Sequence, residues 1–332
     1  MLTPTKPNTH TASENFHQDV VLGLQQPLKE IPCKYLYDER GSALFDKICQ
    51  LEEYYVSRAE TEIMLRHVDE MATVLGSRTR LIEFGSGSSD KTRVLLDSLP
   101  DAVGYIPVDI SETHLLSTAA VLQSQYPHLE VLPVVADFTR PFALPSLNAG
   151  SDQQVQRPSL STYRTTVYFP GSTIGNFSPE QAFKLLTHIA SICRVGDGLL
   201  IGVDLQKDPQ VLERAYNDAR GVTAAFNCNL LPRMQRELSA DLDPDGFEHY
   251  AFYNQHQGRI ESYLKSLRSQ SITIDNWHFE IEEGELIHTE YSYKYTIDGF
   301  RKLAQSAGLT FNQAWTDSRD YFAVLHFARA AG

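Results

Sequence analysis

The chain has 332 residues, of which 42% are hydrophobic and 21% are charged, and its formal net charge at pH 7 is -13. Binding to nucleic acids and to anionic membranes is driven by clustered Lys and Arg, so this acidic balance argues against both partners and favours a small-molecule substrate. The composition is that of a folded globular chain, and the length predicts one large α/β domain with a smaller one, or a heavily decorated core.

No apolar run is long enough to span a bilayer, and the segment from Met1 to Gln18 lacks the apolar core of a signal peptide. The four cysteines, Cys33, Cys49, Cys193 and Cys228, stand in apolar surroundings without Cys-x-x-Cys pairing. This pattern indicates free thiols in a reducing compartment rather than disulfides or structural zinc. We therefore expect a cytoplasmic protein, and we expect it to be a monomer.

Residues 1–16 have no periodic apolar pattern and contain two prolines, which predicts a mobile tail, with ordered structure starting near Asp19. From Arg58 to Leu75, apolar residues recur at helical spacing. Glu60 and Glu62 stand in the first turn, where the helix dipole favours acidic side chains. This segment is predicted to be a helix.

Between residues 81 and 203, short apolar runs alternate with helical patterns. Such alternation predicts βαβ units and a sheet with five parallel strands. The predicted strands are Leu81–Phe84, Gly104–Val108, Glu130–Val135, Thr165–Phe169 and Gly198–Val203; the predicted helices are Asp90–Leu99, Glu112–Gln125 and Pro179–Arg194; and Pro141–Ser161 is predicted to be a loop.

The alternation stops after Leu205, where a helical pattern from Pro209 to Leu238 is followed by strand-like runs. We interpret this region, as far as Ser292, as an inserted lobe. Afterwards the helix Ile297–Ala307 ends at Gly308, and two apolar runs are predicted to close the sheet as an antiparallel pair. The strand-like runs are Phe247–Tyr253, Ser271–Ile274 and Trp277–Ile281, and the closing pair is Leu309–Trp315 with Tyr321–Phe327.

A glycine-containing loop, Glu83-Phe84-Gly85-Ser86-Gly87, stands between a predicted strand and a predicted helix. Glycines there permit a tight turn and a close approach of the backbone to a ligand. The third glycine of the dinucleotide fingerprint is missing, which disfavours a nicotinamide-dependent oxidoreductase. The loop favours the methionine part of S-adenosylmethionine over a pyrophosphate, although alone it is equally compatible with a structural turn.

Acidic residues end the next two predicted strands. Asp109 is placed to accept hydrogen bonds from ribose hydroxyls, and Asp137 from an adenine amino group, while Phe138 packs on the ring. Each Asp alone is more often a helix cap, but together with the loop they indicate S-adenosylmethionine, because ligands bind at the carboxyl ends of such strands. Asn176 follows the fourth strand and suits a substrate carboxylate or amine as well as it suits a turn.

Several long motifs are more specific than the glycine loop. They are Tyr37–Phe45, Leu51–Tyr55, Arg58–Thr61, Glu83–Ser88, Gly171–Asn176 and Thr289–Ser292. Together they resemble the histidine Nα-methyltransferases of ergothioneine biosynthesis, and the resemblance spans nearly the whole chain.

The resemblance implies an α/β fold with two parts. A Rossmann-like S-adenosylmethionine-dependent methyltransferase domain, with a mostly parallel sheet and a closing antiparallel hairpin, would comprise residues 59–204 and 293–330. A second, substrate-binding lobe would comprise residues 17–58 and 205–292. The activity implied is the Nα-trimethylation of L-histidine to hercynine.

The resemblance also implies site residues. Asn176 and Tyr216 would hold the substrate carboxylate, and Tyr37 would lie near the α-amino group with Gly171 and Thr173. The side-chain end would be surrounded by Tyr54, Phe226, Glu290 and Ser292, the last two hydrogen-bonding an imidazole. S-adenosylmethionine would contact Gly85, Ser86, Gly87, Lys91, Asp109, Asp137 and Phe138, with Lys91 pairing with its carboxylate.

Alternatives remain for these residues and for the activity. Tyr54 and Phe226 are compatible with ordinary core positions, and Glu290 and Ser292, two residues apart, with the solvated face of a strand. The nearest rival activity is N-methylation of another amino acid or amine, such as tryptophan or a derivative. A non-catalytic S-adenosylmethionine-binding sensor is a more distant one. The eleven histidines show no metal-ligand pairing, so no metal site is expected.

Overall fold

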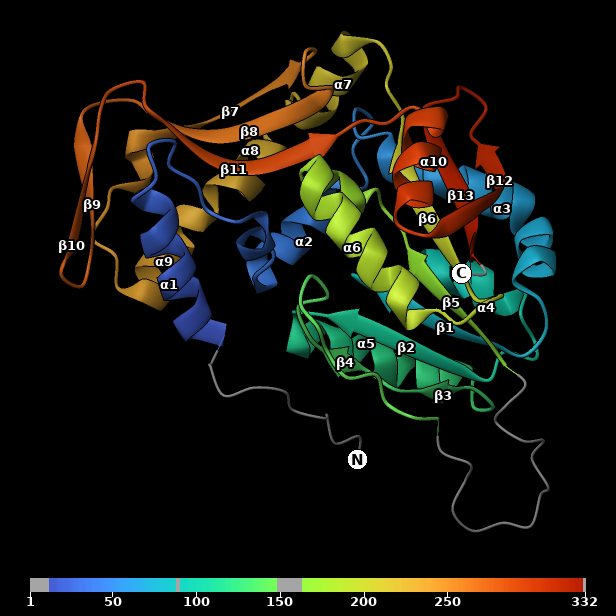
Figure 1. Ribbon diagram of the computed structural model, residues 1–332. Coiled ribbons are helices and arrows are strands. Elements are labelled where there is room, and N and C mark those ends of the chain that lie inside the picture. The colour runs from blue at the N-terminus through green and yellow to red at the C-terminus, as the bar shows by residue number, and fades with distance from the viewer. Residues whose placement is uncertain (1–11, 88–89, 148–162, 331–332) are drawn as a thin grey trace.

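The computed structural model describes residues 12–87, 90–147 and 163–330. Residues 1–11 of the predicted tail, residues 148–161 of the predicted loop, and Ser88 and Ser89 lie outside the described residues. The central sheet has eight strands in the order β12-β13-β6-β5-β1-β2-β3, with β4 also pairing with β2 (Figure 1). The strands are β1 Thr79–Phe84, β2 Gly104–Asp109, β3 Glu130–Val131, β4 Val134–Val135, β5 Arg164–Phe169, β6 Gly198–Asp204, β12 Leu309–Thr316 and β13 Phe322–Arg329.

The sequence prediction of a parallel sheet with an antiparallel closing pair is confirmed. Strands β1 to β6 pair in parallel, with Ile82 of β1 lying opposite Ile106 of β2 and Val167 of β5. Strand β13 pairs antiparallel with both β6 and β12. The fold is therefore α/β, with the Rossmann-like sheet and the closing antiparallel hairpin that the sequence predicts.

Helices cover both faces of this sheet, because successive strand residues point to opposite faces and both sets are apolar. Ile82 and Val167 belong to the core on one face with α6 and α10, and Leu81 and Tyr168 to the core on the other face with α3, α4 and α5. No helix in the described part of the chain is long and apolar enough to cross a membrane. These helices are α3 Val56–Leu75, α4 Asp90–Asp97, α5 Glu112–Gln125, α6 Pro179–Ile192 and α10 Ile297–Ser306.

The predicted strand Glu130–Val135 is two short strands instead. Pro133 lacks a backbone N–H and cannot complete the ladder, so β3 and β4 pair with opposite ends of β2. After β4 the chain leaves the sheet, and Asp137 begins a turn in which its carbonyl accepts a hydrogen bond from the Arg140 N–H.

The N-terminal prediction is wrong for residues 12–16. Helix α1, Ala12–Leu24, starts well before Asp19. Phe16 is fully buried and its ring packs 4.4 Å from that of Tyr35, in the 3-10 helix η1, Cys33–Leu36. A single large apolar side chain within a polar stretch carries no periodic signal, which is why the segment resembles a tail. Helix α2, Glu39–Ile48, follows with Asp38 as its N-cap.

The inserted region forms a second, three-stranded antiparallel sheet in the order β11-β8-β7, and a separate hairpin of β9 and β10. In Figure 1 this sheet arches over α8 and lies beside the large sheet. Strand β8, its central strand, is an element that the sequence analysis did not predict. The strands are β7 Phe247–Asn254, β8 Arg259–Ser266, β9 Gln270–Ile274, β10 Trp277–Ile281 and β11 Leu286–Tyr293.

The single helical pattern from Pro209 to Leu238 is three helices. Gly221 has a φ of 68°, a left-handed conformation that interrupts the helix. Asp218 then caps the next helix by accepting hydrogen bonds from the backbone N–H groups of Val222 and Thr223, at 2.9 and 2.8 Å. The helices are α7 Pro209–Tyr216, α8 Val222–Cys228 and α9 Leu230–Leu238, and a short 3-10 turn, η4 Pro244–Gly246, leads into β7.

The inserted region leaves and rejoins the large sheet at one place. The chain leaves after β6 at Asp204 and returns after β11 at Lys294. The two crossing segments are hydrogen-bonded, since the Tyr295 N–H donates to the Asp204 carbonyl and the Gln206 N–H to the Tyr295 carbonyl, both at 2.9 Å. Both crossings lie beside the candidate site.

Candidate active site

The glycine loop follows β1 and turns through left-handed backbone conformations. Gly85 and Gly87 have φ values of 71° and 41°, which a residue with a side chain rarely adopts. A Cβ at Gly87 would meet no heavy atom within 4 Å, so the space beside the loop is open. Asp109 ends β2 next to this loop, and its carboxylate accepts a hydrogen bond from the Ser111 N–H at 2.9 Å. Burial raises the pKa of Asp109.

Asp137 and Phe138 follow β4 at the same edge of the sheet. The Asp137 carboxylate accepts a hydrogen bond from the Thr139 N–H at 3.0 Å and lies 3.6 Å from the Lys34 ammonium of η1. The Phe138 ring stacks on Phe84 with 5.2 Å between ring centroids. Their predicted contacts with adenine stay predictions, and each side chain also has a structural partner.

Lys91 is paired inside the protein. Its ammonium forms a very short ion pair with Glu60 of α3, whose side chain is fully buried. The Glu60 carboxylate also accepts a hydrogen bond from the Gly171 N–H at 2.9 Å. Glu60 therefore joins the lysine predicted for the cofactor to the loop predicted for the substrate, and it lies beyond the first turn of α3, in which the sequence analysis had placed it.

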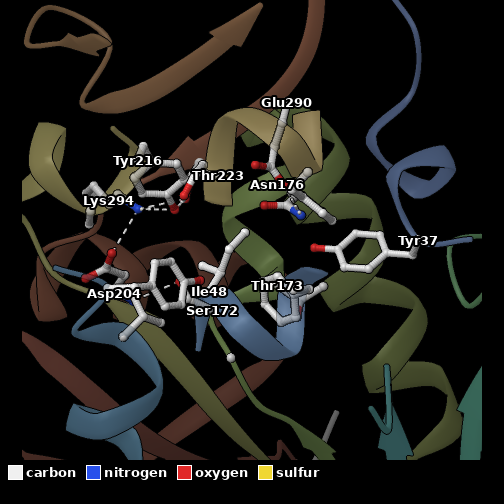
Figure 2. Close-up of a pocket in the computed structure, with 17 residues that line it drawn as sticks. Tyr37, Ile48, Ser172, Thr173, Asn176, Asp204, Tyr216, Thr223, Glu290 and Lys294 are labelled. Carbon is white, nitrogen blue, oxygen red and sulfur yellow. Dashed lines mark hydrogen bonds and ion pairs between the residues drawn. The ribbon is translucent and has the colours of Figure 1, made fainter. Parts of the chain in front are cut away.

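A pocket next to this junction brings together all nine side chains and loop residues that the sequence analysis assigned to substrate and catalysis. Figure 2 shows the Tyr37 hydroxyl pointing into it, toward the side where Asn176 and Glu290 lie. The nine are Tyr37, Tyr54, Gly171, Thr173, Asn176, Tyr216, Phe226, Glu290 and Ser292.

The pocket is built from both sheets. Asn176 ends the 3-10 helix η3, Thr173–Asn176, which follows β5 of the large sheet, whereas Glu290 and Ser292 belong to β11 of the small sheet. The two β11 side chains both line the pocket, as alternation along a strand predicts for residues two apart. The wall opposite is aromatic, with the Tyr37 and Phe226 rings 5.4 Å apart.

Glu290 is one of the two acidic side chains among the described residues that line the pocket, the other being Asp204. Its carboxylate lies 3.4 Å from the amide nitrogen of Asn176. Burial raises the pKa of Glu290 to about 7, although the nearby ammonium of Lys294 acts in the opposite direction. Burial and the nearby Glu290 also raise the pKa of Tyr37 well above its ordinary value. The pocket therefore combines a carboxyl that titrates near neutrality with a phenol that keeps its proton.

Ser292 and Tyr216 belong to a buried polar network in the pocket wall. The Tyr216 hydroxyl donates to the Ser292 hydroxyl oxygen at 2.8 Å. The Lys294 ammonium donates to both oxygens, at 3.1 and 2.7 Å, and forms an ion pair with Asp204 at 2.8 Å. Burial alone would raise the pKa of Asp204, but the ammonium groups of Lys294 and Lys207 hold it below its ordinary value.

Within the described residues, no group of three or more His, Cys, Asp or Glu side chains is arranged to hold a metal ion. The four cysteines are free thiols, and burial raises the pKa of Cys33 and Cys193 to about 12. The chemistry of the pocket therefore rests on carboxyl, phenol, amide, hydroxyl and ammonium groups.

The chain matches a family model described as histidine-specific methyltransferase, SAM-dependent, over residues 16–329. The chain belongs to this family. This histidine-specific methyltransferase family member is 39% identical over 319 residues to the histidine N-alpha-methyltransferase of Mycolicibacterium smegmatis, covering 95% of each chain. It is 38% identical over 314 residues to the histidine N-alpha-methyltransferase of Mycobacterium tuberculosis, covering 93% of each chain. Ergothioneine biosynthesis protein 1 of Neurospora crassa is 29% identical over 300 residues, which are 88% of this chain and 32% of that protein.

Membership makes this methyltransferase an enzyme that uses S-adenosylmethionine, and the crevice at the ends of β1, β2 and β4 suits that cofactor. The open glycine loop exposes backbone to a ligand, and the half-buried carboxylate of Asp109 can accept hydrogen bonds from hydroxyl groups. The Lys91 ammonium lies where the crevice meets the pocket, since a Cβ at Gly171 would be 4.0 Å from it. A methyl donor in the crevice and an amino acid in the pocket would therefore be neighbours.

Sequence reasoning missed several residues of this methyltransferase site. Asp204 and Lys294 line the pocket, yet they stand at the ends of strands, where charged residues are usually solvated. Glu60 lies within a motif that supported the family resemblance, but its role was not foreseen. The available signal was that Lys294 follows Ser292 by two residues, so that both point to one side of an extended chain.

Proposed function

We propose that this enzyme transfers three methyl groups in succession from S-adenosylmethionine to the α-amino nitrogen of L-histidine. The product is the trimethylated betaine hercynine, an intermediate in ergothioneine biosynthesis. The proposal rests on one observation: Glu290 and Ser292 line the same pocket as Asn176 and Tyr216. One pair suits an imidazole ring and the other an α-carboxylate. The names of the mycobacterial relatives support histidine as the substrate.

Asn176 and Tyr216 would hold the substrate carboxylate through their N–H and O–H groups. Glu290 would accept a hydrogen bond from one imidazole nitrogen, while Ser292 would donate to the other. Tyr54 and Phe226 would enclose the ring on its apolar faces. This arrangement leaves the α-amino nitrogen beside Gly171, Thr173 and the Tyr37 hydroxyl.

When bound, S-adenosylmethionine supplies an activated methyl group, so the protein chiefly has to align a neutral amine behind it and exclude water. An ammonium has no lone pair and must first lose a proton. Burial and Glu290 raise the pKa of Tyr37, so this phenol keeps its proton and cannot take one from the ammonium. Tyr37 would orient the amine by hydrogen bonding, and the proton would leave to solvent.

Gly85, Ser86 and Gly87 would receive the methionine part of the cofactor, with Lys91 beside its carboxylate. The two parts of the chain would divide the work, with residues 17–58 and 205–292 binding the amino acid and residues 59–204 and 293–330 binding the cofactor. We further infer a monomeric enzyme acting in the cytoplasm on small molecules, with no nucleic-acid partner. Sedimentation velocity and cell fractionation test these two points.

The test of the substrate is mass spectrometry of reactions that contain S-adenosylmethionine and either histidine, tryptophan or tyrosine. We expect mono-, di- and trimethylhistidine to appear in turn, with no methylated product from the other two amino acids. Methylation of tryptophan without methylation of histidine would identify a different member of this activity class. The absence of all methylated products would contradict the proposal.

Asp109→Ala should weaken S-adenosylmethionine binding by about tenfold, because a buried charge-assisted hydrogen bond is lost. Histidine binding should change much less, because Asp109 does not line the amino-acid pocket. Calorimetric titration of each ligand measures both effects. The exposed Asp101 provides the control, and Asp101→Ala should leave both affinities unchanged. Unaltered cofactor affinity in Asp109→Ala would refute the ribose assignment.

A further inference from the structure

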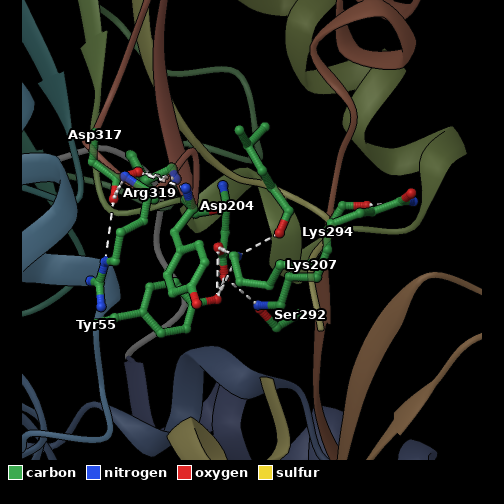
Figure 3. A network of polar contacts seen from close by, with 12 residues as sticks. Tyr55, Asp204, Lys207, Ser292, Lys294, Asp317 and Arg319 are labelled. Carbon is green, nitrogen blue, oxygen red and sulfur yellow. Dashed lines mark hydrogen bonds and ion pairs between the residues drawn. The ribbon is translucent and has the colours of Figure 1, made fainter. Parts of the chain in front are cut away.

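Among the described residues that line the pocket, Lys294 is the one cation, and its side chain is 0% exposed. Its ammonium has three N–H groups and three partners, which are the Asp204 carboxylate, the Tyr216 hydroxyl oxygen and the Ser292 hydroxyl oxygen. Figure 3 labels Lys294 together with Asp204 and Ser292. The lysine therefore contacts two side chains that the proposed function assigns to the substrate. It comes from the segment directly after β11.

The contacts of Lys294 determine what the two hydroxyl groups can offer. A hydroxyl has one proton to donate and two lone pairs that accept, whereas an ammonium group can only donate. Lys294 therefore occupies an acceptor position on Tyr216 and another on Ser292. The Tyr216 hydroxyl donates to the Ser292 oxygen, but because Lys294 donates to both oxygens, the Tyr216 and Ser292 protons can turn toward a ligand without leaving a buried oxygen unpaired.

The charges of the network favour the same direction. Asp204 is the carboxylate shared by Lys207 and Lys294, and the three side chains are between 0% and 4% exposed. One negative and two positive charges leave an excess of one positive charge when both lysines are protonated. Asp317 acts on Lys207 with a charge of the opposite sign, and Glu290 acts in the same way on Lys294. The cation that faces an anionic group of a ligand is therefore Lys294, because it lines the pocket.

We propose that Lys294 is a positioning residue that makes Tyr216 and Ser292 hydrogen-bond donors toward the bound amino acid. This inference rests on the proposed function, because it takes the ligand of the pocket to be an amino acid with a carboxylate and a ring nitrogen that accepts. Donors from Tyr216 and Ser292 face those groups, while Glu290 accepts from the remaining ring N–H. The pocket thereby selects a neutral imidazole through one donor and one acceptor.

Lys207 offers a matched control that distinguishes a positioning role of Lys294 from a merely structural one. It also forms an ion pair with Asp204, and its ammonium donates to the Tyr55 hydroxyl at 2.7 Å. Lys207 does not line the pocket. Replacing either lysine by methionine removes one positive charge next to the Asp204 carboxylate. Only Lys294→Met also removes the ammonium that donates to the Tyr216 and Ser292 hydroxyl oxygens.

The experiment compares Lys294→Met with Lys207→Met by calorimetric titration of histidine and of S-adenosylmethionine, together with KM and kcat for histidine. We expect Lys294→Met to weaken histidine binding by about tenfold or more and to raise KM correspondingly. Cofactor affinity should be unchanged, and Lys207→Met, which removes the same charge but no donor from the pocket, should weaken histidine binding far less than Lys294→Met does. Equal losses of histidine affinity in the two variants would show that only net charge matters and would overturn the proposal. Unaltered histidine affinity in Lys294→Met would overturn it as well.

Two further variants guard against misfolding and test the donor itself. If Lys294→Met does not fold, the triple variant Asp204→Asn/Lys207→Met/Lys294→Met removes all three buried charges and should show a similar loss of histidine affinity. Lys294→Gln keeps N–H donors without the charge and should bind histidine more tightly than Lys294→Met does. A Gln variant no better than Met would contradict the proposal. Failure of the unsubstituted enzyme to bind histidine would instead contradict the proposed function.

Discussion

Asp204→Ala should lower the free energy of unfolding by about 3–5 kcal/mol, because it leaves buried charges without their partner. Lys207 and Lys294 both contact this carboxylate, and their side chains are 4% and 0% exposed. The Tyr55 hydroxyl also donates to it, at 2.8 Å. Urea unfolding at pH 7, followed by circular dichroism, measures the change in the midpoint and in the unfolding free energy.

The control for this variant is an exposed ion pair. Glu180 and Lys184 are one helical turn apart at 2.7 Å, and their side chains are 77% and 70% exposed. Glu180→Ala should leave the unfolding free energy nearly unchanged, because water and salt screen an exposed pair. A comparable loss in the two variants would show that the buried carboxylate contributes nothing beyond a surface pair.

The pH dependence of this contribution has a definite sign. Lys294 and Lys207 overcome the effect of burial and lower the pKa of Asp204 in the folded protein. The stabilisation is therefore fully present above the ordinary pKa of an aspartate and is lost as the pH falls through the lower, folded-state pKa. Unfolding of the unsubstituted protein should become easier in acid by this amount, whereas Asp204→Asn should lack the corresponding part of the pH dependence.

Glu290→Ala should weaken histidine binding by roughly ten- to a hundredfold, because it removes a buried acceptor of an imidazole N–H. The cofactor affinity should not change, since Glu290 lies on β11, away from the crevice at the ends of β1 and β2. The turnover number at saturating histidine should fall less than the affinity does. Calorimetry and steady-state kinetics give both values, and normal histidine affinity would refute the assignment.

The affinity for histidine should also depend on pH through Glu290. Burial raises the pKa of this carboxyl to about 7, so it accepts hydrogen bonds fully only above neutrality. Below that pH it becomes protonated, as does an imidazole with an ordinary pKa near 6.5, and two protonated groups would then face each other. Histidine affinity should therefore decrease between pH 8 and pH 5. Glu290→Gln should bind more weakly at pH 8 and show a shallower decrease.

Much of the fold was predictable because its signals are local. The alternation of apolar runs and helical patterns gave the parallel strands, and the pairing of β12 with β13 followed from two apolar runs separated by a turn. Helix α6 starts where Ser178 caps it and Pro179 occupies its first turn, both of which are readable signals. Strand β8 was not predictable in this way. Its polar Glu261 and Ser262 are buried, so no alternation appears.

The residues of the site likewise fall into those that local sequence signals predict and those that they do not. Tyr37, Asn176 and Glu290 were found through motifs, and their presence in one pocket follows from a fold that brings distant segments together. Lys294 and Glu60 were missed because their importance lies in being buried, and burial of a charge depends on partners far away in the chain. The partner of Glu60 is Lys91, 31 residues later, and that of Lys294 is Asp204.

The single place where the inserted region leaves and rejoins the large sheet has an evolutionary consequence. Because the crossings at Asp204 and Lys294 are adjacent and tied together, the strands between them can change without altering the register of β6 or β13. Glu290 and Ser292 belong to the inserted region, whereas Asp109 belongs to the large sheet. Descendants of one ancestral enzyme could therefore diversify in the amino acid that they methylate while inheriting the methyl-donor crevice intact.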